Sequence, residues 1–374
     1  MKGIVSMKLS CLTFHDSSNY GAVLQTYALQ TFLTSMGHEY EVINYSNAEK
    51  RKFDSLTGRN RELSLPLYLY KLAELPLEAY KKQKFQSFSD RYLNKTPRFY
   101  TMEELRNYAK NRDAIVVGSD QVWNASMIRQ DSAYFLKFTE KRKKLSYAAS
   151  LGVSKVTDSQ RRFYEEMLAD FDRIAVREQS GAKLIEEISG KAAEVVLDPT
   201  LLLTREDWGK ICSPVPDRPY IFAYILRHDP KVQDFLKKLQ KQTGLPVRYV
   251  TRGYVSALRD GATCVPSPEE WVSQIMNAEY VVTTSFHGTA FSVNFKRTFF
   301  TFVDGDITNG TNSRQVDFLR SVGLESRLNP SYPGEICLDA PDFSQVDTVL
   351  TRKREEARAY LEKALADVER EALR

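Results

Sequence analysis

Apolar runs of strand length alternate with helical patterns along most of the chain. Residues 40–45 and 113–117 are rich in β-branched and aromatic side chains, which is typical of buried strands. Residues 22–36 instead space their apolar side chains as one face of a helix, and Gly37 ends that helix. Strand, helix and strand in this order form a βαβ unit, so the pattern predicts an α/β fold with a parallel sheet.

The same signals repeat to the end of the chain. A chain of 374 residues is too long for one compact core, so we expect two domains. We place the boundary near Leu203, which gives an α/β domain at 1–203 and a second at 204–374 that ends in a long helix. The predicted strands are 8–14, 40–45, 113–117, 144–149, 172–176, 193–197, 220–226, 247–251, 279–284 and 298–303. The predicted helices are 22–36, 65–80, 81–93, 102–110, 159–171, 180–188, 230–243, 267–276, 289–294, 315–322 and 344–373.

Residues 47–112 form a basic and polar insertion in the first domain. It is either a lid over an acceptor or a helical cover for the sheet, and we favour the second for most of it. The terminal helix carries one apolar stripe and is predicted to pack back over the first domain. Contact with a membrane surface is the weaker alternative, because acidic residues balance its basic ones.

Composition and charge narrow the classes of function. The net charge of +5 and the pI of about 8.8 fit an anionic substrate or a membrane-surface acceptor, and do not point to nucleic acid. The four cysteines are far apart, which favours buried free thiols in a reducing compartment over disulfides or a zinc site. The first residues resemble a strand more than a signal peptide, and no run reaches membrane-helix length. We therefore expect a cytoplasmic protein.

Residues 277–302 contain the strongest candidate for chemistry. A predicted strand runs into Ser285, Phe286, His287 and Gly288, and a short helix is predicted to follow. His287 would lie at the carboxyl end of a strand and at the start of a helix, where α/β sheets bind ligands and anions are favoured. A lone histidine more often caps a helix or fills a corner, but this order of elements favours the functional interpretation.

Polar residues follow other predicted strands in the same way. The strand at 113–117 runs into a polar turn whose Trp123 could stack on a sugar ring, although a single tryptophan more often fills a core. Arg177 follows the strand at 172–176, and its alternative is a surface pair with Glu178. Asn19 and Gly21 precede the first predicted helix. They either contact a ligand or only form a turn, and the spacing favours neither interpretation over the other.

A cleft between the two domains would bring these side chains together. His287 is the natural proton-transfer group near neutral pH, and two arginines suit a carboxylate or a phosphate. Arg314 lies in a predicted loop at 309–314, just before a helix, where it could meet an anion. No Walker A loop, HExxH or DxD-like motif is present, so nothing in the sequence requires a metal. The residues expected to face the cleft are Asn19, Asp120, Arg177, His287 and Arg314.

Six segments in register resemble the polysaccharide pyruvyl transferase family. They are NYGAVLQTYALQ, IVVGSDQVWN, AVREQSGAKLI, VLDPTLLL, TSFHGTAFSVNF and NSRQVDFL, and they extend from about Leu9 to about Leu328. Each segment alone is modest evidence, whereas six in order are specific. The resemblance implies two Rossmann-like domains facing a cleft, in the manner of GT-B glycosyltransferases, and a donor site without a metal or a resident cofactor.

The resemblance also implies roles for single residues. By position, His287 is the catalytic histidine and Arg177 is the arginine that contacts the donor. Some members have an arginine two residues before the histidine and an aspartate after the Asn-x-Gly turn, where this chain has Ser285 and Ala22. Our hypothesis is that Arg314 supplies the missing positive charge. The substrate-binding residues are then expected to be Asn19, Tyr20, Gly21, Gly118, Ser119, Asp120, Gln121, Trp123, Ser285, Gly288 and Arg314.

The reaction implied by the resemblance moves the pyruvyl group of phosphoenolpyruvate onto two hydroxyls of a sugar, forming a cyclic ketal. The acceptor is a saccharide of a cell-surface or exopolysaccharide precursor, either lipid-linked, polymeric or free, and a lipid-linked one places the protein at the inner face of the membrane. Two alternatives stay open. One is a GT-B glycosyltransferase that uses a nucleotide sugar, and the other is a non-catalytic glycan-binding protein that kept the fold.

Overall fold

The computed structural model describes residues 6–46, 65–153, 155–215, 218–250, 261, 264–303, 310–330 and 334–373, with the backbone alone at 65–73 and 310–313. Its described strands form two four-stranded sheets, and every pairing is parallel. Two Rossmann-like α/β halves are therefore confirmed. The first sheet has the order β2 (Glu39–Val42), β1 (Lys8–Leu12), β3 (Ala114–Val117), β4 (Lys144–Ser146), and the second has β10 (Thr298–Thr301), β9 (Tyr280–Thr283), β7 (Ile221–Tyr224), β8 (Val247–Tyr249).

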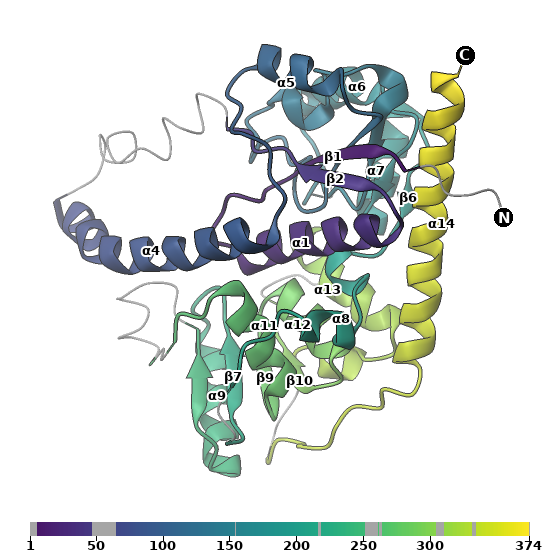
Figure 1. The fold of residues 1–374 in the computed structure, drawn as a ribbon. Coiled ribbons are helices and arrows are strands. Elements are labelled where there is room, and N and C mark those ends of the chain that lie inside the picture. The colour runs from purple at the N-terminus through teal and green to yellow at the C-terminus, as the bar shows by residue number, and fades with distance from the viewer. Residues whose placement is uncertain are drawn as a thin grey trace.

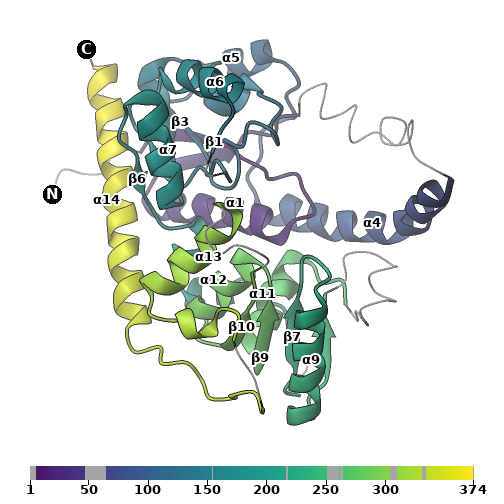
Figure 2. The ribbon, with the colours of Figure 1, turned by 180° about the vertical axis from the view of Figure 1, so that it is seen from behind.

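Two short strands extend the first sheet. β5 (Ala175–Val176) and β6 (Glu194–Val195) pair in parallel, and a bridge from Ala149 to Val176 joins them to the edge beyond β4. Helices surround both sheets (Figures 1 and 2). They are α1 (Tyr20–Ser35), α4 (Leu65–Tyr92), α5 (Met102–Ala109), α6 (Asp158–Leu168), α7 (Gln179–Ser189), α8 (Arg205–Gly209), α9 (Pro230–Thr243), α11 (Pro268–Asn277), α12 (Phe286–Asn294), α13 (Gly310–Ser321) and α14 (Val346–Ala372). The short 3-10 helices are η1 (Ser132–Phe135), η2 (Lys141–Lys143), η3 (Pro199–Leu201) and η4 (Glu325–Arg327).

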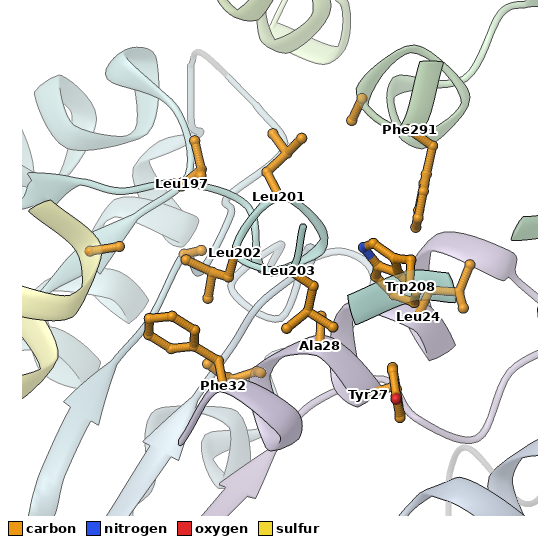
Figure 3. Close-up of a cluster of buried hydrophobic side chains, with 14 of the residues drawn as sticks. Leu24, Tyr27, Ala28, Phe32, Leu197, Leu201, Leu202, Leu203, Trp208 and Phe291 are labelled. Carbon is orange, nitrogen blue, oxygen red and sulfur yellow. The ribbon is translucent and has the colours of Figure 1, made fainter. Parts of the chain in front are cut away.

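Aromatic and aliphatic side chains fill the junction between the halves (Figure 3). Trp208 of α8 meets Phe291 of α12 edge-on, with ring centroids 4.8 Å apart. Tyr20 at the start of α1 stacks on Trp271 of α11 at 5.2 Å. Burial of apolar surface is the dominant stabilising contribution in folding, so the junction holds the two halves together.

α14 runs along the side of both halves (Figures 1 and 2). Near its start, Arg354 donates to the carbonyl of Leu201 and to Asn294 Oδ1. Further along, the hydroxyl of Tyr360 donates to the carbonyl of Ser146, 2.9 Å away in the first sheet. The helix thus returns to the first half, as expected. The boundary near Leu203 stays a prediction, although the strands of the first sheet precede it and those of the second follow it.

Several predicted boundaries are wrong, chiefly at helix starts. α1 begins at Tyr20 and α12 at Phe286, because Asn19 and Ser285 act as N-caps. α13 begins at Gly310, so the predicted loop at 309–314 is helical from there on. Residues 65–92 form one helix that passes through Pro76, where two had been predicted.

The insertion at 47–112 is described in part, since residues 47–64 lie outside the described ranges. The C-terminal part of α4 contacts both α/β halves of the molecule. Phe85 packs on Tyr20 of the first half, and the Lys84 ammonium pairs with Glu270 of α11 in the second half at 2.9 Å. This part is structural, as we had favoured. None of the described helices is long and apolar enough to cross a bilayer. All four cysteines are free, but only Cys11 is fully buried.

Candidate active site

The carboxyl ends of strands from both sheets meet at one cluster of charged side chains. Asp120 follows β3, and Arg177 with Glu178 follows β5. His287 lies in the first turn of α12, directly after β9. Its Nε2 is 3.8 Å from an oxygen of Asp198, which follows β6 in the first half. The two sheets therefore direct their carboxyl ends toward each other, which is the predicted GT-B-like plan.

Arg177 is enclosed by three carboxylates. Its Nη1 donates to Asp198 at 2.9 Å, while Glu178 and Asp120 lie 3.7 and 3.8 Å from its other nitrogens. The Arg177 side chain is only 1% exposed. Burial alone would lower the pKa of Arg177, but the surrounding carboxylates outweigh it and raise that pKa above its ordinary value. The predicted alternative of a surface Arg–Glu pair is wrong, because both partners are buried.

Asp198 is the most heavily bonded of these carboxylates. Its Oδ1 accepts from the backbone N–H and the hydroxyl of Thr200, at 3.0 and 2.7 Å, and caps η3. Its Oδ2 accepts from Arg177. Burial opposes its ionisation, yet the neighbouring His287 and Arg177 and these hydrogen bonds hold the pKa of Asp198 below its ordinary value. We infer that Asp198 is a permanent anion at the centre of the cluster.

The imidazole of His287 is held between the two halves. A Cβ on Gly21 of α1 would lie 2.0 Å from its Nδ1, so only glycine leaves room for the ring. Nε2 is buried and has no hydrogen-bond partner among the described residues. Burial lowers the pKa of His287, Asp198 partly counters this, and Arg177 adds to the decrease. His287 is therefore neutral near pH 7 when no ligand is bound.

Arg314 reaches the same cluster from the second turn of α13. Its guanidinium carbon is 5.9 Å from the ring centroid of Phe286, and that of Arg177 is 5.3 Å from the same ring. No carboxylate within 4.0 Å pairs with Arg314 in the part of the chain that the structure describes, and its Nε is buried without a partner. Burial and the charge of Arg177 lower the pKa of Arg314 to about 10. The carboxylates of Glu178, Asp120 and Asp198 counter this decrease only in part. Among the described residues, this cation is thus desolvated without a direct carboxylate partner.

A family model for polysaccharide pyruvyl transferases matches residues 19–305, well over half of the sequence. The chain belongs to the polysaccharide pyruvyl transferase family. The part of the chain that matches the family model contains Arg177, Asp198 and His287, and it ends before Arg314. No curated protein matches the chain.

Solved structures resemble this pyruvyl transferase family member over most of its length, at low identity. Escherichia coli heptosyltransferase WaaC with ADP has 11% identity and a TM-score of 0.41, covering 93% of this chain and 100% of its own. UDP-GlcNAc 2-epimerase from Methanocaldococcus jannaschii has 13% identity and a TM-score of 0.44, covering 92% and 100%. Escherichia coli ADP-heptose LPS heptosyltransferase II has 10% identity and a TM-score of 0.39, covering 96% and 99%. At these scores the likenesses carry no argument about function.

Two aromatic residues predicted to bind substrate are core residues. Trp123 is fully buried, its ring stacks on Phe135 at 5.5 Å, and its indole N–H donates to the carbonyl of Tyr134. Tyr20 is also buried, and its hydroxyl donates to the carbonyl of Pro266. Neither ring offers a face to a sugar, so these two assignments are corrected.

The turn after β3 is shaped by its own backbone. Gly118 has a φ of +119°, and a Cβ there would lie 2.2 Å from the carbonyl oxygen of Tyr147, so the position requires glycine. Ser119 is buried and its hydroxyl donates to the carbonyl of Ala148. Both residues have protein partners and serve to place Asp120 beside Arg177.

Four other predicted residues make local contacts in the described structure. Asn19 and Ser285 cap α1 and α12, accepting from the backbone N–H of Gly21 and Gly288. Gln121 accepts from the side chain of Asn124. Gly288 is needed because a Cβ would lie 2.3 Å from Thr283 Oγ1. Contact of these residues with a substrate stays a prediction.

The sequence analysis did not assign three residues to this charged cluster. They are Asp198, Phe286 and Glu178, which was considered only at the surface and is buried. Asp198 follows a strand just as Asp120 and Arg177 do, so the strand-end argument applied to 193–197 would have found it. Phe286 stands beside His287 in the most diagnostic segment. Over the described residues, no three histidine, cysteine or acidic side chains are grouped to hold a metal ion.

Proposed function

We propose that the protein transfers the pyruvyl group of phosphoenolpyruvate to two hydroxyls of a sugar in a polysaccharide precursor, forming a cyclic ketal. Membership of the pyruvyl transferase family supports transfer to a saccharide. The observation that carries the choice of donor is Arg314, a desolvated cation without a carboxylate partner among the described residues, in the same cluster as His287. A buried unpaired charge is unfavourable, so this position favours binding of an anion.

Phosphoenolpyruvate suits this arrangement because it has a phosphate and a carboxylate close together. Guanidinium groups recognise either group through paired hydrogen bonds. Arg177 is already neutralised by carboxylates, so Arg314 is the group that gains most from the donor. An anion here would also raise the pKa of the nearby His287 and favour its protonated form.

The proposed reaction balances in protons and electrons. A proton from His287 adds to the methylene carbon of the enolpyruvyl group, and a cationic centre forms at C2. One sugar hydroxyl bonds to C2 and loses its proton, the C2–O bond to phosphate then breaks, and the second hydroxyl closes the ring with loss of its own proton. Of the two protons lost, one restores His287 and the other leaves with phosphate. Arg314 stabilises the charge that develops on the phosphate.

The remaining parts of the proposal follow from this chemistry. Phosphoenolpyruvate is a substrate, and the proposed reaction uses no resident cofactor. The acceptor is a saccharide, which is lipid-linked, polymeric or free. Cytoplasmic location, with contact at the inner face of the membrane for a lipid-linked acceptor, stays a prediction.

The test is to incubate the protein with phosphoenolpyruvate and a panel of free and lipid-linked galactosides, glucosides and mannosamine derivatives. Released phosphate and the mass of the sugar product are measured together. We expect phosphate release in step with a sugar that has gained one ketal-linked pyruvate. Transfer of a sugar from a nucleotide sugar to the same acceptors, with no reaction of phosphoenolpyruvate, would replace the proposal with the glycosyltransferase alternative.

A further inference from the structure

The buried carboxylate of Asp198 joins the two halves of the charged cluster. It belongs to the loop between β6 and η3, whereas the imidazole that it faces belongs to α12 of the second half. Thr200 takes both hydrogen bonds of Oδ1, and Arg177 takes one at Oδ2. The remaining lone-pair direction of Oδ2 is the one available to Nε2 of His287, which is 3.8 Å away.

We propose that Asp198 is a positioning residue that holds the imidazole of His287 with Nε2–H directed at its carboxylate, and so fixes the orientation and the tautomer of the ring. The role in turnover rests on the proposed function, but the arrangement of the ring does not. The separation of 3.8 Å is about 1 Å longer than an N–H···O hydrogen bond, so a small approach of the two halves completes the contact.

The packing around Asp198 and around His287 limits the positions that the two side chains can take. Asp198 caps η3, which packs against α1 and α12. Leu201 of η3 and the two leucines that follow it lie in the apolar junction (Figure 3). The imidazole lies against Gly21 of α1 on its Nδ1 side. Asp198 is thus anchored to η3 by its hydrogen bonds to Thr200, and the imidazole of His287 is enclosed by α1.

Four charged groups act on His287. Asp198 and Asp120 favour the protonated ring, whereas Arg177 and Arg314 disfavour it. Asp198 is the anion within 4.0 Å of the ring in the described structure, and Arg177 holds it ionised. The rival interpretation is that Asp198 only caps η3 and neutralises Arg177, with no effect on the histidine.

The proton position on His287 separates these interpretations in the wild-type protein. Long-range ¹H–¹⁵N spectra report which ring nitrogen carries the proton, and a His287→Gln sample assigns the signal among the four histidines. We expect the Nε2–H form. A ring protonated on Nδ1 would overturn the proposal, and this measurement needs neither substrate nor a variant of Asp198.

The matched pair of variants is Asp198→Asn and Asp131→Asn. Both aspartates cap 3-10 helices by accepting from the backbone N–H two residues later, but Asp131 caps η1, away from the cluster. We expect the pKa of His287 to fall in Asp198→Asn and to stay unchanged in Asp131→Asn. An unchanged pKa in both variants would overturn the proposal, and if Asp198→Asn does not fold, the wild-type proton position decides.

Turnover gives a third readout. Asp198→Asn should lower kcat about tenfold or more, while KM for phosphoenolpyruvate changes less than about twofold, because Arg314 is untouched. A raised KM with an unchanged kcat would assign Asp198 to donor binding and contradict the positioning role. Absence of pyruvyl transfer in the wild type would count against the proposed function alone, since the spectra do not depend on it.

Discussion

Arg177 and Arg314 lie at similar distances from the ring of Phe286, 5.3 and 5.9 Å, yet their surroundings are opposite. Arg177 comes from the first half and is enclosed by three carboxylates, which raise its pKa. Arg314 comes from the second half, has no carboxylate partner among the described residues, and has its pKa lowered to about 10. From this difference follows our proposal that Arg177 holds the site together and that Arg314 binds the anionic donor.

This comparison revises the roles expected from the sequence. Arg177 had been expected to contact the donor by resemblance, but its side chain is almost fully buried and already paired. Arg314 had been chosen only for its position before a predicted helix. Both assignments to substrate stay predictions, and the environments of the two residues now give each a separate test.

We expect the largest effect from a change of His287, the proposed proton-transfer group. His287→Gln should lower kcat roughly 10²–10⁴-fold, because the glutamine side chain cannot gain or lose a proton near neutral pH. Initial rates of phosphate release measure this. The control is His228→Gln, an exposed histidine after β7, which should retain its rate. Near-normal turnover in His287→Gln would remove the histidine from the mechanism.

The two arginines should differ most in their effect on folding. Arg177→Met keeps the volume of the side chain but leaves the buried carboxylates of Asp198 and Glu178, and the partly exposed one of Asp120, without their cation. The free energy of unfolding should therefore fall by about 3–5 kcal/mol. Arg314→Met removes a charge that has no direct carboxylate partner among the described residues, so the free energy of unfolding should stay level or rise. Urea unfolding of both variants checks the difference. Equal losses of unfolding free energy in the two variants would contradict different roles for the two arginines.

For donor binding, we expect the larger effect from the change of Arg314 and the smaller one from the change of Arg177. Arg314→Met should raise KM for phosphoenolpyruvate roughly ten- to a hundredfold, since a hydrogen bond to a charged group is worth about 1.5–3 kcal/mol. Arg314→Lys keeps the charge without the planar fork and should recover part of the loss. A KM unchanged in both variants would mean that another group binds the donor.

The smallest effect is a pH dependence of stability from His287. Burial, countered only in part by Asp198, holds the pKa of His287 below its ordinary value of 6.5. The unfolded chain therefore binds a proton at higher pH than the folded one does. The stability from this group is complete above pH 6.5 and is lost as the pH falls from there through the folded pKa. Urea midpoints measured between about pH 7.5 and 5 should fall less steeply for His287→Gln than for wild type.

Most of the fold could be predicted, because the period and the length of an apolar run determine whether the segment forms a helix or a strand. The βαβ opening and the strands of both sheets follow from that pattern. Helix starts were less accurate, since Ser285 and Asn19 take up capping roles that local composition does not separate from a turn. Pro76 also lies inside a continuous helix, where a break had been predicted.

The site could be predicted in part for the same reason. Asp120, Arg177 and His287 were found because each follows a strand, and the sheets then bring them together. Trp123 was assigned wrongly because its burial depends on residues outside the motif, here Phe135 and the more distant Phe171. Nothing local to the sequence distinguishes a paired arginine from an unpaired one. Arg177 is paired because Asp198 follows β6, whereas Arg314 lies on α13, far away in the chain.

Our central proposal is that Arg314, a desolvated cation without a direct carboxylate partner among the described residues, binds phosphoenolpyruvate. Thermal unfolding of the wild-type protein, with phosphoenolpyruvate, a set of nucleotide sugars or glycans added separately, tests it most directly, because a ligand that binds the folded state raises Tm. We predict that phosphoenolpyruvate raises Tm in wild type and Asp131→Asn but has little effect in Arg314→Met. A rise with a nucleotide sugar or with glycans alone, and none with phosphoenolpyruvate, would contradict the claim.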